Sequence, residues 1–178
     1  MMGTLAGIGL GTNLGDRMGH LCDARAELEA LAGVKLLAAS NIYETEPVGV
    51  PAEYAHMAFL NAVLLFDVEL DVEEWSTHVH AIEDKLLRVR TEVRNTPRTI
   101  DLDLLFFGDV VMERPHLHLP HPQCRNRRFV CMPLCDVAPD LHLPGEDTRS
   151  MKEVLAAMSE IPAVKLYSTE WNAIGNKE

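Results

Sequence analysis

Residues 97–108 constrain the fold most, because their sequence predicts a β-strand that is buried on both faces. A proline fixes how the chain enters this run of strand-forming residues, and a glycine ends it. Side chains alternate between the faces of a strand, so Asp101 and Asp103 share one face, with Cα atoms about 6–7 Å apart. Apolar residues fill both faces: Ile100, Leu102, Leu104 and Phe106 on one, Leu105 and Phe107 on the aspartate face. We predict a central strand with a charged mouth at one end.

Hydrophobic periodicity along the chain predicts an α+β domain. The expected strands lie over residues 5–10, 34–45 and 58–68 and within the run 97–108. The expected helices are one with apolar positions from Leu21 to Leu31 and one over 71–90. The order strand, helix, strand, strand, helix, strand is the ferredoxin-like βαββαβ arrangement with an antiparallel sheet. Two-sided burial of the fourth strand implies helices on both faces. Helices over 125–137 and 151–158 and a last strand over 164–167 follow.

Composition narrows the functional class. The 178 residues predict a single domain over 1–178, with a motif-bearing core over about residues 5–140 and a C-terminal helical addition over 141–178. A net charge of −11 argues against nucleic acid or an anionic membrane as a partner. The four cysteines lack paired extracellular spacing, and no apolar run approaches the roughly 18 residues of a membrane helix. We expect a cytoplasmic monomer.

Basic side chains cluster around the aspartate strand. Seven of the eleven arginines lie within residues 88–98 and 125–128. In a chain this acidic, such clusters beside paired carboxylates predict a pocket for a small polyanion. Acceptor-only oxygens at this spacing suit Mg²⁺, which commonly completes its shell with phosphate oxygens and water. We therefore favour metal–phosphate chemistry at Asp101 and Asp103 over two solvated charges at a strand end.

Other motifs favour structural interpretations. The glycine-rich residues 7–16 fit neither G-x-G-x-x-G nor a P-loop, so a tight strand-to-helix turn is favoured. For Asn61 we favour a structural role, as a buried amide whose hydrogen bonds are satisfied within the core, over a role in ligand recognition. Histidines and cysteines raise a zinc alternative, which lacks a supporting spacing pattern; its members are His116, His118, His121, His142, Cys124, Cys131 and Cys135. We interpret His121, followed by Arg125, Arg127 and Arg128, as a phosphate or ribose donor.

Residue chemistry alone predicts a domain that handles a metal-bound polyphosphate, and it names no acceptor. Five motifs in order add to this: residues 11–16, 43–49, 59–62, 97–103, and 119–122 together with 127–130. In these motifs the chain resembles the 6-hydroxymethyl-7,8-dihydropterin pyrophosphokinase family over roughly residues 5–140. The resemblance implies transfer of diphosphate from ATP to the hydroxymethyl oxygen of a dihydropterin, with release of AMP, in folate synthesis.

The resemblance also implies roles for individual residues. Asp101 and Asp103 hold two Mg²⁺ ions, and Arg88 and Arg98 act with them as the catalytic set. The ATP-binding residues are Glu83, Arg90, Arg98, His121 and Arg127. The pterin-binding residues are Thr45, Glu46, Val48, Phe59, Asn61 and Phe129. In these roles Asn61 forms hydrogen bonds with the amide edge of the pterin, and Phe59 and Phe129 enclose the ring.

Two other functions remain open on the sequence. A palm-like nucleotidyl transferase also places paired aspartates on a ferredoxin-like sheet, but it needs a basic template surface that the acidic chain does not suggest. A non-catalytic regulatory domain that binds a nucleotide would need neither the metal carboxylates nor an acceptor pocket. The products formed from ATP, and the dependence of nucleotide binding on Mg²⁺, discriminate among the three.

Overall fold

A computed structural model describes residues 2–47, 49–86 and 100–172 of the chain. Its helices are α1 (Arg17–Glu29), α2 (Val72–Lys85), α3 (Arg128–Val137) and α4 (Met151–Ala156), with a 3-10 turn, η1, at Ala52–Tyr54. Its strands are β1 (Thr4–Thr12), β2 (Val34–Ala39), β3 (Ile42–Thr45), β4 (Phe59–Val68), β5 (Asp101–Phe107), β6 (Met112–Arg114), β7 (Leu117–Leu119) and β8 (Val164–Ser168). Within the described residues no helix is both long and apolar enough to cross a membrane.

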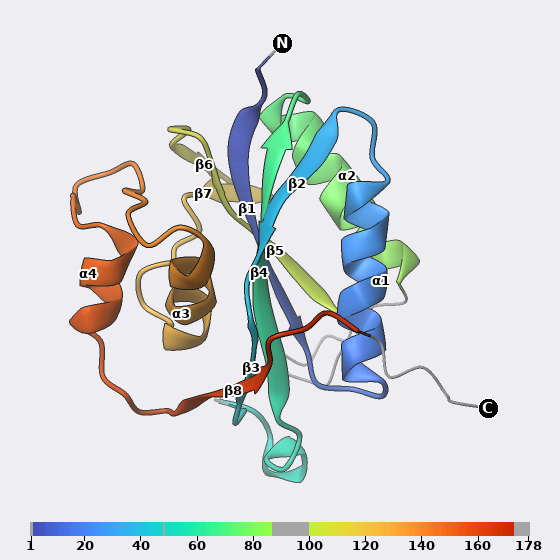
Figure 1. Ribbon diagram of the computed structural model, residues 1–178, viewed down its shortest axis with the longest axis vertical. Coiled ribbons are helices and arrows are strands. Elements are labelled where there is room, and N and C mark those ends of the chain that lie inside the picture. The colour runs from blue at the N-terminus through green and yellow to red at the C-terminus, as the bar shows by residue number, and fades with distance from the viewer. Residues whose placement is uncertain (1, 48, 87–99, 173–178) are drawn as a thin grey trace.

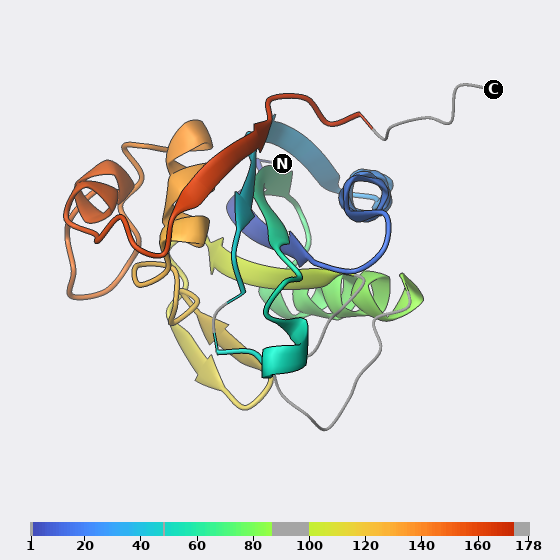
Figure 2. The same ribbon diagram turned by 90° about the horizontal axis from the view of Figure 1, so that it is seen from below.

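The main sheet is antiparallel, with strand order β5-β1-β4-β3-β8, and β2 also pairs with β4. Helices α1 and α2 cover one face, and α3 and α4 lie on the other (Figure 1). The view from below shows the same three layers and the long segment that carries the chain from α4 to β8 (Figure 2). The predicted ferredoxin-like arrangement with helices on both faces is confirmed.

The segment predicted as one strand over residues 34–45 is two strands. Both β2 and β3 pair with β4, and Ser40 lies between them. The Ser40 N–H donates to the Val63 carbonyl at 2.9 Å, and the Val63 N–H donates to the Ser40 hydroxyl at 2.8 Å. These bonds satisfy buried backbone groups where the strand breaks, so the change of direction leaves the sheet intact.

Each face of the sheet carries its own hydrophobic cluster. Alternate residues of β1 and β4 pack with α1 and α2 in the first cluster, which includes Ile8, Leu64, Phe66 and Trp75. Residues on the opposite face of β4 and β5 pack with α3 and α4 in the second, which includes Val63, Leu105, Leu134 and Val154. This double burial explains why β4 and β5 read as nearly continuous apolar runs.

The prediction of a central strand within residues 97–108 is wrong, because β5 lies at the end of the strand order. Helices bury both of its faces, and the sequence pattern reports that burial rather than the number of neighbouring strands. Groups outside the sheet satisfy the outer edge of β5. The Leu102 N–H donates to Glu83 Oε2 at 2.7 Å, and the Leu105 carbonyl accepts from the His121 N–H at 2.8 Å.

The predicted faces of β5 also need a correction near its end. The pairing of β1 with β5 shifts register between Gly7 and Ile8, so that Leu104 lies opposite Ile8 but Phe106 lies opposite Gly7. Such a bulge moves the following side chains to the other face. Phe106 consequently packs in the second cluster and Phe107 in the first, the reverse of the simple alternation.

Candidate active site

A cavity of about 710 Å³ lies at one end of the main sheet. Its walls come from the end of β1, the starts of β4 and β5, the end of β3, α2 and the first residues of α3. Ten residues predicted for the site line it: Thr45, Glu46, Phe59, Asn61, Glu83, Asp101, Asp103, His121, Arg127 and Phe129. Four others, Val48, Arg88, Arg90 and Arg98, lie outside the described residues. The structure therefore brings together all the predicted site residues that it describes.

Gly9 and Gly11 leave space for this cavity on one face of β1, and Gly7 accommodates the Phe106 ring on the same strand. A Cβ atom added to Gly7 would lie 2.4 Å from Cε1 of Phe106, and one added to Gly9 would lie 3.2 Å from Leu105. At Gly11 the nearest atom is Asn61 Oδ1 at 3.5 Å, and Gly9 and Gly11 both line the cavity. The glycine-rich segment is thus a strand face without side chains, in addition to the turn predicted after it.

The two aspartates lie directly opposite these glycines. Asp101 pairs with Gly11 and Asp103 with Gly9 across β1 and β5, so no β1 side chain stands beside either carboxylate. Both residues are half-buried and line the cavity. Two acceptor-only carboxylates on one strand face, beside space large enough for phosphate groups, fit the oxygen donors that Mg²⁺ requires.

Glu83 connects α2 to the aspartate strand. Its side chain is 1% exposed, and its carboxylate accepts the Leu102 N–H, the backbone group between Asp101 and Asp103. A buried backbone N–H needs a hydrogen-bond partner, and this bond supplies one. The carboxylate of Glu83 therefore fixes the backbone that carries both aspartates.

His121 presents a defined tautomer. The Gln123 N–H donates to its Nδ1 at 3.1 Å, so the ring proton of the neutral imidazole lies on Nε2. Burial lowers the pKa of His121, the Arg127 guanidinium lowers it further, and the Asp101 carboxylate opposes the shift. At neutral pH the ring is consequently a neutral donor through Nε2–H, which matches the predicted role as a phosphate or ribose donor.

Polar and aromatic groups surround another part of the cavity. The Asn61 side chain is 6% exposed, and its Nδ2 donates to Thr45 Oγ1 at 2.8 Å, which fixes the orientation of the amide. Phe59 precedes it on β4, and Phe129 lines the cavity from the first turn of α3. The Arg127 guanidinium carbon lies 5.6 Å from the Phe129 ring centroid, a cation–π distance. A rigid amide beside two aromatic rings suits a flat heterocycle with polar edges.

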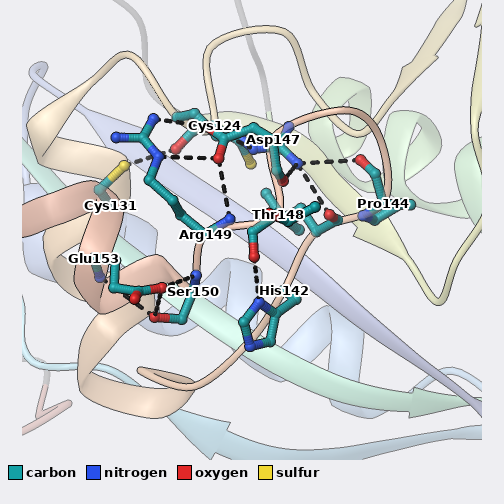
Figure 3. Close-up of polar contacts among 11 residues, drawn as sticks. Cys124, Cys131, His142, Pro144, Asp147, Thr148, Arg149, Ser150 and Glu153 are labelled. Atoms are coloured by element: carbon teal, nitrogen blue, oxygen red, sulfur yellow. Dashed lines mark hydrogen bonds and ion pairs between the residues drawn. The ribbon is translucent and has the colours of Figure 1, made fainter.

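Part of the predicted basic cluster has a structural role instead. Arg125 Nη2 donates to the carbonyls of Leu143 and Pro144 at 3.0 and 3.1 Å, and Arg125 is absent from the cavity lining. The helix predicted from residue 125 begins at Arg128, so Arg125 precedes it and lies toward the 143–147 loop. Figure 3 shows this loop, with Pro144, Asp147 and Arg149 in one polar group.

The residues of the zinc alternative are engaged elsewhere. The His116 ring contacts Glu73 at 2.9 Å, and the His142 ring contacts the Thr148 carbonyl at 2.8 Å. The Cys131 thiol donates to the Cys124 carbonyl, and burial raises the pKa of both thiols to about 12. Among the described residues no three histidine, cysteine, aspartate or glutamate side chains form a metal-binding group.

Sequence reasoning missed several residues of the cavity. His80 lies on α2 one turn before Glu83, and this helical spacing was a usable signal. Asn126 adjoins the predicted Arg127, and Arg128, which was predicted only as part of the basic cluster over 125–128, also lines the cavity. Met158, Ser159, Ile161 and Pro162 also line the cavity, and no motif marks them because they follow the last recognised motif by almost thirty residues.

Comparisons with known proteins agree with this geometry. Residues 7–139 match the family model described as 7,8-dihydro-6-hydroxymethylpterin-pyrophosphokinase. Relatives named 2-amino-4-hydroxy-6-hydroxymethyldihydropteridine pyrophosphokinase include one from Pseudomonas aeruginosa, 39% identical over 84% of this chain and 89% of its own length. One from Bacillus subtilis is 41% identical over 76% of this chain and 79% of its own length. One from Synechocystis sp. is 35% identical over 90% of this chain and 77% of its own length.

Solved structures share the fold. The wild-type HPPK-DHPS of Plasmodium falciparum with SDX-DHP superposes with a TM-score of 0.67 at 14% identity, covering 86% of this chain. The chain spans 44% of the length of that protein, and at this identity the likeness concerns the fold alone.

Proposed function

We propose residue roles in a diphosphate transfer on one premise: the chain belongs to the 7,8-dihydro-6-hydroxymethylpterin-pyrophosphokinase family. The protein is a small-molecule transferase of folate biosynthesis with ATP as co-substrate. It moves diphosphate from ATP to the hydroxymethyl oxygen of 6-hydroxymethyl-7,8-dihydropterin, and AMP leaves. The observation that carries the assignment is that Asp101, Asp103, Asn61 and Phe129 share one cavity.

The nucleotide part of the site centres on the start of β5. We assign Asp101 and Asp103 as the ligands of two Mg²⁺ ions, which when bound neutralise the triphosphate and polarise its phosphorus–oxygen bonds. Glu83 supports this assignment because it fixes the backbone between the two carboxylates. In phosphoryl transfer, positioning and electrostatic stabilisation supply most of the rate enhancement. A rigid aspartate strand contributes to both.

Donor groups around β5 complete the ATP site. His121 offers Nε2–H, and Arg127 brings a guanidinium to the same cavity. We place Glu83 and Arg90 on the nucleotide side as well, and assign Arg88 and Arg98 to the transferred phosphates, because a guanidinium matches phosphate oxygens in a bidentate geometry. Arg98 lies in the motif over residues 97–103, and Arg88 and Arg90 belong to the basic cluster that precedes it in the sequence, which supports the assignment.

The acceptor part of the site centres on the starts of β4 and α3. We assign Asn61 to the amide edge of the pterin, and the backbone from Thr45 and Glu46 to Val48 to the same edge. Phe59 and Phe129 would enclose the flat ring. The bond from Asn61 to Thr45 supports this role, because a fixed amide discriminates among hydrogen-bonding edges at little entropic cost.

A product assay tests the proposal. With ATP, Mg²⁺ and the hydroxymethyl-dihydropterin, we expect AMP and the pterin diphosphate in equal amounts. Asp101→Asn and Asp103→Asn should each lower turnover by about a hundredfold or more, because charge neutralisation by a metal is worth several kcal/mol. Circular dichroism should remain that of the wild type.

Asp109→Asn is the matched control, since Asp109 is exposed in the turn after β5 and lies outside the cavity lining. Release of ADP would contradict diphosphate transfer, and release of pyrophosphate would favour the nucleotidyl transferase. Nucleotide binding that is indifferent to Mg²⁺, without turnover, would favour the regulatory domain. Near-full turnover in either cavity variant would refute the metal assignment.

We further propose that the chain works as a single-domain monomer in the cytoplasm without a nucleic-acid or membrane partner. The net charge of −11 supports the lack of polyanionic partners. Sedimentation equilibrium of the purified protein tests the oligomeric state, and a dimer at micromolar concentration would contradict it.

A further inference from the structure

Residues 158–162 form an additional wall of the cavity, and we call this segment the C-terminal wall. It lies between α4 and β8, beyond residues 7–139 that match the family model. We propose that the C-terminal wall contacts the bound dihydropterin through Ile161 and so raises the affinity for the acceptor but not for ATP. This inference rests on the proposed function, since it names a substrate of the same site.

The C-terminal wall is anchored at both ends. Before it, α4 begins with a capping box in which Ser150 and Glu153 exchange hydrogen bonds, shown in Figure 3. Met151 and Val154 bury that helix in the second hydrophobic cluster, against which Met158 also packs. After the wall, β8 pairs with β3. Fixed ends limit the entropy lost when the wall contacts a ligand.

An internal hydrogen bond further shapes the C-terminal wall. The Ile161 N–H donates to Ser159 Oγ at 3.2 Å, a local turn that orders the backbone around the isoleucine. The Ile161 side chain therefore stands on a backbone with a defined course rather than on an unrestrained loop.

Sheet order places the C-terminal wall beside the acceptor part of the site. In the pairing of β3 with β8, Val164 lies opposite Thr45, whose hydroxyl accepts from Asn61. The aspartates lie on β5, at the opposite end of the order β5-β1-β4-β3-β8. Three strands thus separate β8 from the metal-binding carboxylates, whereas Thr45 is its direct neighbour.

The chemistry of the C-terminal wall suits an apolar contact. Ile161 is 83% exposed although it lines the cavity, and Met158 and Pro162 add further apolar surface there. An exposed isoleucine at a binding site gains free energy when a ligand covers it, because apolar surface leaves water. A flat heterocycle offers such a surface, and the pairing of Val164 with Thr45 makes the pterin rather than the adenine of ATP the heterocycle beside the C-terminal wall.

The test compares Ile161→Ser with Val111→Ser. Val111 is a matched control, because it is 66% exposed in the turn between β5 and β6 and does not line the cavity. Calorimetry measures binding of the hydroxymethyl-dihydropterin in the presence of Mg²⁺ and a non-hydrolysable ATP analogue. Steady-state assays give KM for both substrates.

We expect Ile161→Ser to weaken pterin binding about tenfold and to raise KM for the pterin, with kcat and KM for ATP unchanged. Ile161→Val should give a smaller change in the same direction, and Val111→Ser none. Unchanged pterin affinity in Ile161→Ser, or an equal effect on ATP, would overturn the inference. A wild-type protein that forms no AMP would instead overturn the proposed function, so the two failures are distinguishable.

Discussion

Replacing Gly7 with alanine should destabilise the protein through a clash inside the second hydrophobic cluster. Gly7 lies opposite Phe106 in the sheet, and an added Cβ would lie 2.4 Å from Cε1 and 2.9 Å from Cδ1 of that ring. Phe106 is 1% exposed and packed in the second cluster, so its ring can move only by displacing neighbouring side chains. The backbone or the ring must shift.

The magnitude follows from two opposing terms. Overpacking a well-filled core costs about 1–3 kcal/mol. Replacing glycine with alanine recovers about 0.4–1 kcal/mol by restricting the unfolded chain. The mid-range net loss of unfolding free energy is therefore about 1.3 kcal/mol, with an upper limit of about 2.6 kcal/mol. For a chain of this size the mid-range loss lowers Tm by about 3–5 °C.

Gly11→Ala is the matched control on the same face of the same strand. Its added Cβ meets only Asn61 Oδ1, at 3.5 Å, an ordinary van der Waals contact. The unfolding free energy should stay within about 0.5 kcal/mol of the wild type. The new methyl group would stand beside Asn61 in the cavity, so KM for the dihydropterin should rise while the protein remains folded.

Urea unfolding monitored by circular dichroism measures the first effect, and the AMP assay measures the second. The two substitutions should have different effects. Gly7→Ala should lower the unfolding free energy, and Gly11→Ala should lower the affinity for the dihydropterin. Equal stability losses at both positions would refute this expectation, as would a Gly7→Ala protein as stable as the wild type.

Three further predictions concern single contacts. Because burial lowers the pKa of His121, the unfolded chain binds a proton at this histidine more readily than the folded protein does. The unfolding free energy should therefore fall as the pH drops below about 6.5, and it should fall less steeply in His121→Gln. Urea titrations from about pH 7.5 to 5 measure both. Tyr43→Phe removes hydrogen bonds of 2.9 and 2.8 Å to Asp136 and should cost about 1–2 kcal/mol of unfolding free energy in the same assay. Glu83→Leu removes the acceptor of the Leu102 N–H, whereas the side-chain oxygen of Glu83→Gln can still accept it. The leucine variant should lose about 1–3 kcal/mol more unfolding free energy than the glutamine variant, measured by urea unfolding. It should also bind an ATP analogue in the presence of Mg²⁺ more weakly than the glutamine variant does.

The sequence was sufficient to predict the fold class and ten of the residues that line the cavity. Alternation and helical periodicity are local, and they survive in any tertiary context that buries the same faces. The resemblance to the pyrophosphokinase family, not periodicity, placed Asp101, Asn61 and His121 in one site, and all three line the cavity although 60 residues separate Asn61 from His121. Their roles remain predictions until the substitutions above are measured.

Features of the fold that depend on contacts between residues far apart in the sequence could not be predicted from local sequence patterns. Two-sided burial of β5 comes from helices, so it could not distinguish an edge strand from a central one. The exchange of Phe106 and Phe107 between faces depends on a bulge against β1. Arg125 lies two residues from Arg127 in sequence, yet the chain turns between them before α3 begins, and Arg125 contacts the 143–147 loop instead.

The glycines of β1 and the aspartates of β5 together leave open space around the two carboxylates. Nucleotide-binding loops use glycines so that backbone N–H groups can approach a phosphate. Here Gly9 and Gly11 are strand residues whose backbone pairs with β5, and they lie opposite Asp103 and Asp101. Their contribution is the missing side chains, which leave room beside the carboxylates. The proposed site would bind phosphate through metal held by the two carboxylates, and such a site needs that room rather than a loop. This proposal accounts for the lack of a nucleotide-loop pattern in the segment.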